Sequence, residues 1–258
     1  MDQKAVLALF EQQIRKGLPG EPVSAPSTLV RPEVRAIGAD GSWAMIVWSD
    51  LDASTADAVI AEQIARFAPL GRDFEWKLYS HDQPTDLGQR LIAAGFRPGE
   101  AEAILVADTA ELPTEITLPE GVRLLPVTDA AGVRLVVQAH EEAFGEPSAS
   151  LERRLLAQLA EEPESMAAVV TMAGDLPICA GRVEFSPGTQ FASLWGGGTA
   201  PAWRGRGVYK ALVAYRARLA VERGYRYLQV DAMPASQPIL ARLGFVRLGT
   251  TVPYLYER

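Results

Sequence analysis

The segment Thr199–Leu212, T-A-P-A-W-R-G-R-G-V-Y-K-A-L, combines residue types that bind phosphate groups. Gly205 and Gly207 can adopt positive φ angles and leave backbone amides uncovered at the point where a helix is predicted to begin. Unpaired N–H groups at the positive end of a helix dipole attract anions. Basic side chains surround these amides, namely Arg204, Arg206 and Lys210. The segment therefore predicts a site for a phosphate-bearing ligand.

Two common phosphate-binding loops fit this segment poorly. A P-loop needs G-x-x-x-x-G-K-[ST], but Gly205 and Gly207 lie too close together and Lys210 is followed by Ala211. A dinucleotide-binding loop needs a third glycine where Lys210 stands. Asp231, at the end of a later predicted strand, could play the part of the ribose-binding acid, so a dinucleotide site stays open as an alternative.

The run Arg204-Gly205-Arg206-Gly207-Val208-Tyr209 resembles the pyrophosphate loop [QR]-x-x-G-x-[GA] of the GNAT superfamily of N-acetyltransferases. Tyr209 departs from the small residue of the last position. A strand predicted at Tyr225–Val230 and the L-G-F that ends at Phe245 agree with the resemblance, which covers about residues 121–258. It implies acetyl-CoA as co-substrate, bound by Gly198, Thr199, Arg204, Gly205, Arg206, Gly207, Val208, Tyr209 and Ser236.

The resemblance also implies a reaction, in which a primary amine attacks the thioester directly. A backbone N–H near Gly198 or Thr199 would stabilise the developing oxyanion, and Glu184 is the candidate base. Leu240 stands where many members have the tyrosine that protonates the leaving thiolate. Either the thiolate leaves without an acid, or the chain binds acyl-CoA without turnover, or another side chain supplies the proton, the candidates being Tyr209, Tyr254, Tyr256 and Ser236.

The acceptor site is expected near the end of the first helix of this region, where Glu141 and Trp195 would line it. His140 lies on the apolar face of that helix and is better explained as a packed residue than as a base. Cys179, the single cysteine, is better explained as a buried strand residue than as a nucleophile. Two isolated histidines and one cysteine form no metal-ligand cluster, so no metal is expected.

Alternating patterns of apolar residues predict the elements that position these residues. The expected strands of the C-terminal part are Val122–Val127, Met166–Met172, Ile178–Phe185, Phe191–Trp195, Tyr225–Val230 and a last strand through Leu255. Helices are expected from near Asp129 to Gly145 and over about Leu151–Glu161, Gly207–Arg223 and Gln237–Leu243, with a glycine-rich turn at Gly196–Gly198. The mixed order predicts an α/β or α+β sheet protein.

The first part of the chain looks like a second, degenerate copy of the same domain. R-L-I-A-A-G-F ending at Phe96 matches I-L-A-R-L-G-F ending at Phe245. We therefore expect a tandem pair, with a degenerate domain at residues 1–118 and the catalytic domain at 119–258. Each would be a mixed, mainly antiparallel sheet flanked by helices, with a splayed parallel strand pair in the C-terminal copy. Asp50 or Asp52 would fill the anion position of the first copy, which is therefore expected to bind no CoA.

The composition of the chain argues against several classes of function and partner. The 258 residues carry a net charge of −7, which argues against a nucleic-acid partner, and the acidic first part favours a cationic acceptor. No apolar stretch approaches a membrane span, and the start lacks the features of a signal peptide, so a cytoplasmic protein without a membrane partner is expected. The acceptor would be a small-molecule or peptide amine. A non-catalytic acyl-CoA sensor or interaction module is the alternative function, and a peptidyl or aminoacyl transferase is a third possibility.

Overall fold

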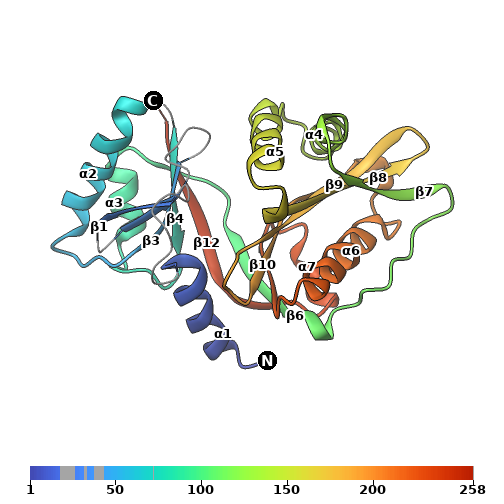
Figure 1. The fold of residues 1–258 in the computed structure, drawn as a ribbon. Coiled ribbons are helices and arrows are strands. Elements are labelled where there is room, and N and C mark those ends of the chain that lie inside the picture. The colour runs from blue at the N-terminus through green and yellow to red at the C-terminus, as the bar shows by residue number, and fades with distance from the viewer. Residues whose placement is uncertain (18–26, 32–33, 38–43, 72, 258) are drawn as a thin grey trace. The chain divides into compact units, whose positions relative to one another are not determined.

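The computed structural model describes residues 1–17, 27–31, 34–37, 44–71 and 73–257 (Figure 1). The chain divides into two compact units, which we call the N-terminal and the C-terminal unit. The N-terminal unit comprises Asp2–Ile104, Asp231–Pro234 and Arg247–Arg258, and the C-terminal unit comprises Leu105–Val230 and Ala235–Val246 together with Met1. These units differ from the two sequence copies predicted at 1–118 and 119–258, because each unit combines separate segments of the chain. The boundary between the predicted copies stays a prediction.

The C-terminal unit contains a mixed sheet with the strand order β6-β11-β10-β9-β8-β7. Strands β7 to β10 pair antiparallel, whereas β10 and β11 are parallel. The strands are β6 (Glu102–Asp108), β7 (Val122–Val127), β8 (Met166–Ala173), β9 (Leu176–Phe185), β10 (Phe191–Thr199) and β11 (Tyr227–Ala232). The first residues of β6 and the last residues of β11 belong to the N-terminal unit.

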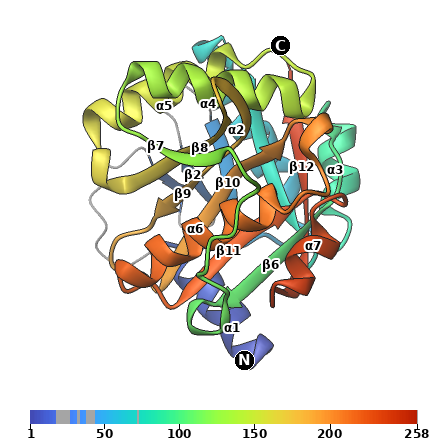
Figure 2. The same cartoon turned by 90° about the vertical axis from the view of Figure 1, so that its right-hand side faces the viewer.

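Helices cover both faces of this sheet. Helices α4 (Ala130–Phe144) and α5 (Ala149–Glu161) lie on one face, and α6 (Val208–Glu222) lies on the other (Figures 1 and 2). A short helix, α7 (Gln237–Arg242), follows β11. The apolar stripe of α4, formed by Val133, Val136 and Val137, packs in a core cluster with residues of β8 and α5.

The helix ends lie where the sequence places start and stop signals. The carboxylate of Asp129 accepts a hydrogen bond of 2.8 Å from the Gly132 N–H, which caps α4. Gly145, at φ +78°, ends the helix in the left-handed conformation that glycine adopts without a steric penalty. The predicted bounds of α4 and α6 are therefore confirmed to within a residue or two.

The glycine-rich segment Gly196–Gly198 is not the turn that the sequence suggested. Strand β10 continues through it to Thr199, and the antiparallel register with β9 resumes at Gly198 after an irregularity between Trp195 and Gly198. The prediction was wrong because a β-bulge uses the same permissive glycines as a turn does. The parallel register of β10 with β11 covers only Phe191–Ser193, so the two strands part well before β10 ends.

The N-terminal unit has the strand order β1-β2-β3-β4-β12, and β5 also pairs with β12. Strands β3 and β4 are parallel and the other pairs are antiparallel. Its elements are α1 (Gln3–Phe10), continued by a π-helical turn at Glu11–Arg15, β1 (Ser27–Arg31), β2 (Val34–Ile37), β3 (Ala44–Ser49), α2 (Ala56–Phe67), β4 (Phe74–Tyr79), α3 (Leu87–Ala93), β5 (Arg97–Pro98) and β12 (Val246–Tyr256).

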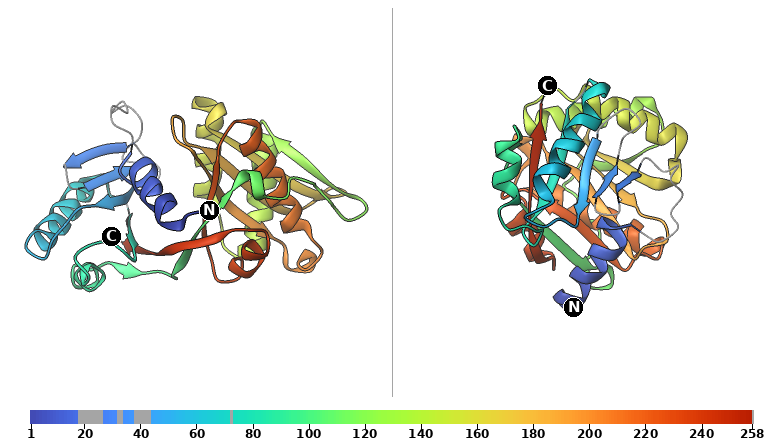
Figure 3. Two further views of the ribbon diagram at one scale, coloured as in Figure 1. Left: turned by 90° about the horizontal axis from the view of Figure 1, so that it is seen from below. Right: turned by 90° about the vertical axis from the view of Figure 1, so that its left-hand side faces the viewer.

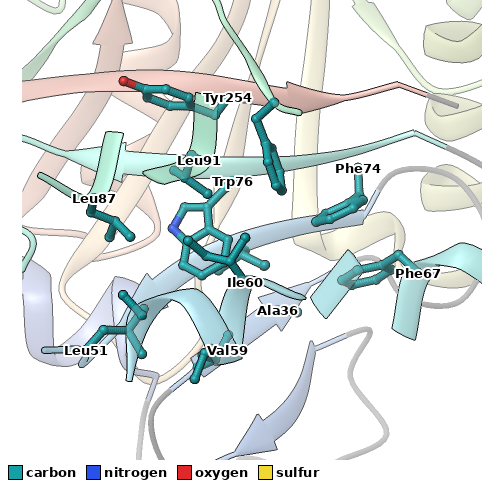
Figure 4. Packing of buried hydrophobic residues seen from close by; sticks show 14 of the residues in the cluster. Ala36, Leu51, Val59, Ile60, Phe67, Phe74, Trp76, Leu87, Leu91 and Tyr254 are labelled. Carbon is teal, nitrogen blue, oxygen red and sulfur yellow. The ribbon is translucent and has the colours of Figure 1, made fainter. Parts of the chain in front are cut away.

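The last strand of the chain belongs to this N-terminal sheet. Strand β12, drawn in red, pairs with β4 in a register that runs from Thr251 opposite Tyr79 to Tyr256 opposite Phe74 (Figure 3). Side chains of α2 and α3 converge on Trp76 of β4, which is almost completely buried (Figure 4). The core of the unit is therefore built from residues that are close to 200 positions apart in the sequence.

A buried lysine holds a group of carboxylates in the same unit. Lys77 on β4 is 6% exposed, and its Nζ lies 2.6 Å from an Asp231 carboxylate oxygen and 3.7 Å from one of Glu102. Burial raises the pKa of both Glu75 and Glu102, whereas the positive charge of Lys77 opposes the rise. The lysine therefore compensates the negative charge of these buried and half-buried carboxylates.

Candidate functional site

The start of α6 presents an open cradle of backbone amides. Gly205 and Gly207 have φ angles of +75° and +80°, and a Cβ atom at either position would meet no atom within 4 Å. In this described stretch, α6 has no side-chain cap and no acidic residue in its first turn. The side chain of Val208 is buried in the core, so this residue contributes its backbone to the loop. An uncapped helix start of this kind favours an anion.

The three predicted basic residues of the loop differ in their positions. Arg204 donates from Nε to the Thr199 carbonyl at 3.1 Å and from Nη2 to the Ala143 carbonyl at 2.9 Å. It therefore ties the loop to the end of α4. The guanidinium of Arg206 lies 4.9 Å from the Trp203 ring, and Lys210 is exposed on the first turn of α6. These two remain the cations best able to approach a bound phosphate.

The bulge in β10 lies between α4 and α6. Gly196 and Gly197 have no register partner on β9, so their backbone groups are released from the ladder. A Cβ at Gly198 would lie 2.8 Å from the Ala143 Cβ and 2.6 Å from the Phe144 ring, so α4 packs directly on this glycine. The Thr199 hydroxyl donates to the Cys179 sulfur at 3.1 Å, so this side chain points into the sheet and away from the loop.

Cys179 is a buried strand residue, as predicted. It is fully buried, and burial raises the pKa of its thiol to about 11. A thiol that stays protonated at neutral pH is a poor nucleophile.

Tyr209, the residue that departs from the family pattern, lies over the bulge. A Cβ at Gly197 would come within 3.1 Å of the Tyr209 ring, so the glycine makes room for the larger side chain. Burial raises the pKa of the Tyr209 hydroxyl, whereas the positive charge of Arg216 and hydrogen bonding with Ser236 oppose the rise. Leu240 is completely buried. Of the predicted proton donors, Tyr209 and Ser236 thus lie together in one unit.

The other two candidate donors belong to the N-terminal unit. Tyr254 is buried in its core cluster, and the ring of Tyr256 packs against Phe74 and Phe96. Both side chains act there as parts of a hydrophobic core.

The predicted base and one predicted acceptor residue lie next to each other on the α4 face of the sheet. Glu184 accepts a hydrogen bond of 2.5 Å from Arg182 Nε, and Trp195 lies opposite Arg182 in the β9–β10 register. The Arg182 guanidinium is 5.6 Å from the Trp195 ring centre. A carboxylate, a guanidinium group and an aromatic ring therefore lie together on this side of the bulge.

His140 and Glu141 complete this face from α4. A Cβ at Gly196 would lie 3.9 Å from His140 Nδ1, and the imidazole packs on Phe144 with ring centres 4.4 Å apart. Burial, followed by the positive charges of Arg182 and Arg154, lowers the pKa of His140. Glu141 accepts a 2.8 Å hydrogen bond from the Ser148 N–H. Glu141 thus holds the connection to α5, and His140 is a neutral side chain beside the bulge.

The equivalent helix of the N-terminal unit carries its own anion. Before α2, the carboxylate of Asp52 accepts hydrogen bonds from the Ser54 and Thr55 N–H groups at 2.8 and 2.9 Å. The Ser54 side chain, with these backbone bonds, lowers the pKa of Asp52. The two amides just before the first residue of α2 are therefore already used by a side chain, unlike those before α6.

Comparison with known proteins identifies this arrangement. Residues 133–245, which run from α4 to the end of α7 and its following turn, match the sequence model of the family described as "Acetyltransferase (GNAT) family". This region is a GNAT domain. No curated protein matches the chain by sequence.

Solved structures show the GNAT fold over nearly the whole chain. A GCN5-related N-acetyltransferase from Kribbella flavida is 18% identical, with a TM-score of 0.68 over 98% of this chain and 93% of that one. A GCN5-related N-acetyltransferase from Sphaerobacter thermophilus is 17% identical, with a TM-score of 0.59 over 87% of this chain and 76% of that one. A tandem GNAT protein from the clavulanic acid biosynthesis pathway is 13% identical, with a TM-score of 0.59 over 87% and 78%. The predicted fold class is confirmed.

Two cations beside the GNAT bulge were missed from the sequence. Arg154 on α5 belongs to a run, L-E-R-R, that has the pattern of a solvated helix face, and Arg182 lies in an apolar strand. Only the fold brings them to His140 and Glu184. Among the described residues, no cluster suited to a metal ion occurs, and no helix there is long and apolar enough to span a bilayer.

Proposed function

We propose that the chain is an acetyl-CoA-dependent N-acetyltransferase that transfers the acetyl group to a primary amine by direct attack on the thioester. The observation that carries this proposal is the uncapped, glycine-framed start of α6 beside the point where β10 parts from β11. An anion cradle next to an opened strand pair suits a ligand with a phosphate end and an extended arm. The degenerate first copy, residues 1–118, would bind no CoA because Asp52 occupies its anion position.

Most of the residues predicted to bind the co-substrate have a part in this proposal. The amides from Gly205 to Tyr209, with Arg206 and Lys210, would hold the pyrophosphate, and Ser236 would act through its bond to Tyr209. Acetyl-CoA supplies the activated acetyl group. A backbone N–H near Gly198 or Thr199, just after the bulge, would donate to the developing oxyanion, a contribution of about 3 kcal/mol in acyl-transfer sites.

Two side chains would move protons. Glu184 would accept a proton from the amine, directly or through water. Tyr209 would donate its proton to the departing sulfur, in place of the tyrosine that Leu240 replaces. Its raised pKa keeps the hydroxyl protonated at neutral pH, as a general acid requires.

A thermal-shift titration tests the co-substrate. Acetyl-CoA at about 100 times its Kd should stabilise the chain by about 2.7 kcal/mol, which raises the Tm by about 2–4 °C for a protein of this size. NAD and ATP serve as controls and should give no shift. A shift with NAD alone would support a dinucleotide site instead.

The base is tested by a pair of variants. Glu184→Gln should lower kcat by about 100-fold or more while leaving the affinity for acetyl-CoA unchanged, because it removes only the proton acceptor. His140→Gln is the comparison, since His140 is the other group beside the bulge that could accept a proton. Loss of activity in His140→Gln with a near-normal Glu184→Gln enzyme would transfer the role to the histidine.

The general acid is tested by Tyr209→Phe, which keeps the ring over Gly197 and removes the hydroxyl. We expect kcat to fall by about 10- to 100-fold with little change in the Kd of acetyl-CoA. Steady-state rates of CoA release together with a separate binding titration check this. An unchanged kcat would mean that the thiolate leaves without an acid from this residue.

A second candidate function is a non-catalytic acyl-CoA sensor. The complete burial of Leu240 at the position of the usual acid favours it. The two functions differ in one observable, since an acetyltransferase releases CoA faster when a suitable amine is added, whereas a sensor binds acetyl-CoA with no amine-dependent release.

A further inference from the structure

Two arginines form a positively charged group on the α4 face beside the bulge. Arg182 on β9 is 5% exposed, and Arg154 on α5 reaches the same place, where each lowers the pKa of His140. Arg182 uses its Nε for Glu184. A Cβ at Gly196 would lie 3.4 Å from Arg182 Nη1, so this guanidinium is directly beside the bulge.

The negative charge nearby does not match these two cations. Within the described part of the chain, Glu184 is the carboxylate that acts on Arg154, and it is already paired with Arg182. Arg154 has no hydrogen bond or ion pair with any described residue, and its Nε is buried without a partner. Burial, followed by the charge of Arg182, lowers the pKa of Arg154 to about 10.

Such an arrangement is unfavourable without a further anion. Arg154 is half-buried, and its buried Nε has no hydrogen-bond acceptor, which is unfavourable. The positive charges of two neighbouring arginines also repel each other. Two other carboxylates, those of Glu141 and Glu146, raise the pKa of His140. Glu141 accepts a hydrogen bond from the Ser148 N–H, and Glu146 is exposed. Arg154, Arg182 and Glu184 together therefore carry one surplus positive charge, and the Nε of Arg154 is a buried donor without an acceptor.

We propose that Arg154 and Arg182 bind a carboxylate of the acceptor, so that the amine substrate is an amino acid or a similarly small amino acid-like molecule. This inference rests on the proposed acetyltransferase activity and names the class of its acceptor. The amine would be at the bulge and the carboxylate on the two guanidinium groups, with the Trp195 ring against Arg182. The short distance from Arg182 to Gly196 requires that only a few bonds separate amine and carboxylate.

Charge favours a carboxylate over a phosphate. A carboxylate carries one negative charge and matches the surplus of the two arginines and Glu184, whereas a phosphate monoester carries about −1.5 to −2 at pH 7. Guanidinium groups also bind carboxylates through two parallel hydrogen bonds. The acidic first part of the chain favours a cationic acceptor. An amino acid meets that expectation through its amino group, but its carboxylate is negative.

The test compares amino acids with their amides. The full chain at saturating acetyl-CoA is assayed for CoA release with the twenty L-amino acids, β-alanine and γ-aminobutyrate, each beside the corresponding amide, and with aminoalkyl phosphonates of the same length. We expect at least one acid to be used with a kcat/KM about 100-fold above that of its amide and above that of its phosphonate. Binding of each acid is also measured by calorimetry with the protein saturated with CoA.

Variants of Arg154 locate the carboxylate. Arg154→Gln should raise the KM of the preferred acid at least 10-fold, change kcat by less than about 3-fold and leave the KM of the amide unchanged. Arg154→Lys should recover part of the loss because it restores the charge. Arg153→Gln is the matched control, since Arg153 is the exposed neighbour on α5 and should have no effect.

The outcomes separate this proposal from the one on which it rests. Acetyl-CoA that gives no thermal shift overturns the acetyltransferase, whereas a normal shift with amides used as well as acids overturns only the carboxylate site. A phosphonate that outperforms the carboxylate also overturns it. If no acid is acetylated and none binds in calorimetry, the two arginines do not serve an acceptor of this class.

Discussion

Gly207→Asp should weaken acetyl-CoA binding by at least about 100-fold, or ~2.7 kcal/mol. The substitution places a carboxylate at the N-cap of α6, where backbone amides are open. Asp52 is a comparable carboxylate near the start of α2, where it accepts from the Ser54 and Thr55 N–H groups. The new carboxylate both satisfies the amides that a pyrophosphate would use and repels its negative charge. Isothermal titration with acetyl-CoA measures the change.

Gly207→Asn is the matched control for this prediction. Asparagine has the same shape as aspartate and, like it, tolerates the positive φ angle of +80° better than most residues do. The two variants therefore share any backbone strain and differ in charge. We expect the Asn variant to lose less than about 5-fold in affinity. Equal losses in both variants would show that conformation, and not charge, governs the loop.

Lys77→Met should destabilise the N-terminal unit by about 3–5 kcal/mol at pH 8. Methionine keeps most of the volume but leaves the Asp231 and Glu102 carboxylates, together with buried Glu75, without the cation that lies among them. Urea unfolding followed by circular dichroism measures the change. Lys4→Met, on the exposed face of α1, is the control and should change stability by less than about 0.5 kcal/mol.

The deficit should depend on pH in a defined direction. Glu75 and Glu102 have raised pKa values in the folded unit, so each carboxyl group binds its proton more tightly when the unit is folded. The stability that this provides is present below the unfolded pKa and is lost as the pH rises through the folded pKa. Without Lys77 these pKa values rise further. The difference from the natural chain should therefore be smaller at pH 5 than at pH 8. A deficit that is equal at both pH values would contradict the role given to Lys77.

Local features of the site could be predicted from the sequence. The loop around Gly205 and Gly207 depends on a few consecutive residues, whose types already determine φ angles and uncovered amides. The bounds of α4 follow in the same way from Asp129 and Gly145. Gly196–Gly198 was assigned wrongly because the sequence contains no sign of whether a partner strand lies beside it.

Features that depend on distant residues could not be predicted. Arg154, Arg182 and His140 come from α5, β9 and α4, and they affect one another only because the fold brings them together. The space that Gly197 leaves for Tyr209 also depends on distant residues, because a glycine of β10 makes room for the large side chain at the start of α6. From the sequence, Tyr209 could either crowd the site or point away.

The place of β12 in the N-terminal sheet has a consequence during synthesis. Strand β4 lacks this neighbour until residues 251–256 have been made, and these follow Ile104 by about 150 positions. At roughly 5–20 residues/s the ribosome takes on the order of 8–30 s to make that stretch. The unit that is translated first is therefore completed last, and until then an exposed edge of apolar strand is available to chaperones or to another nascent chain.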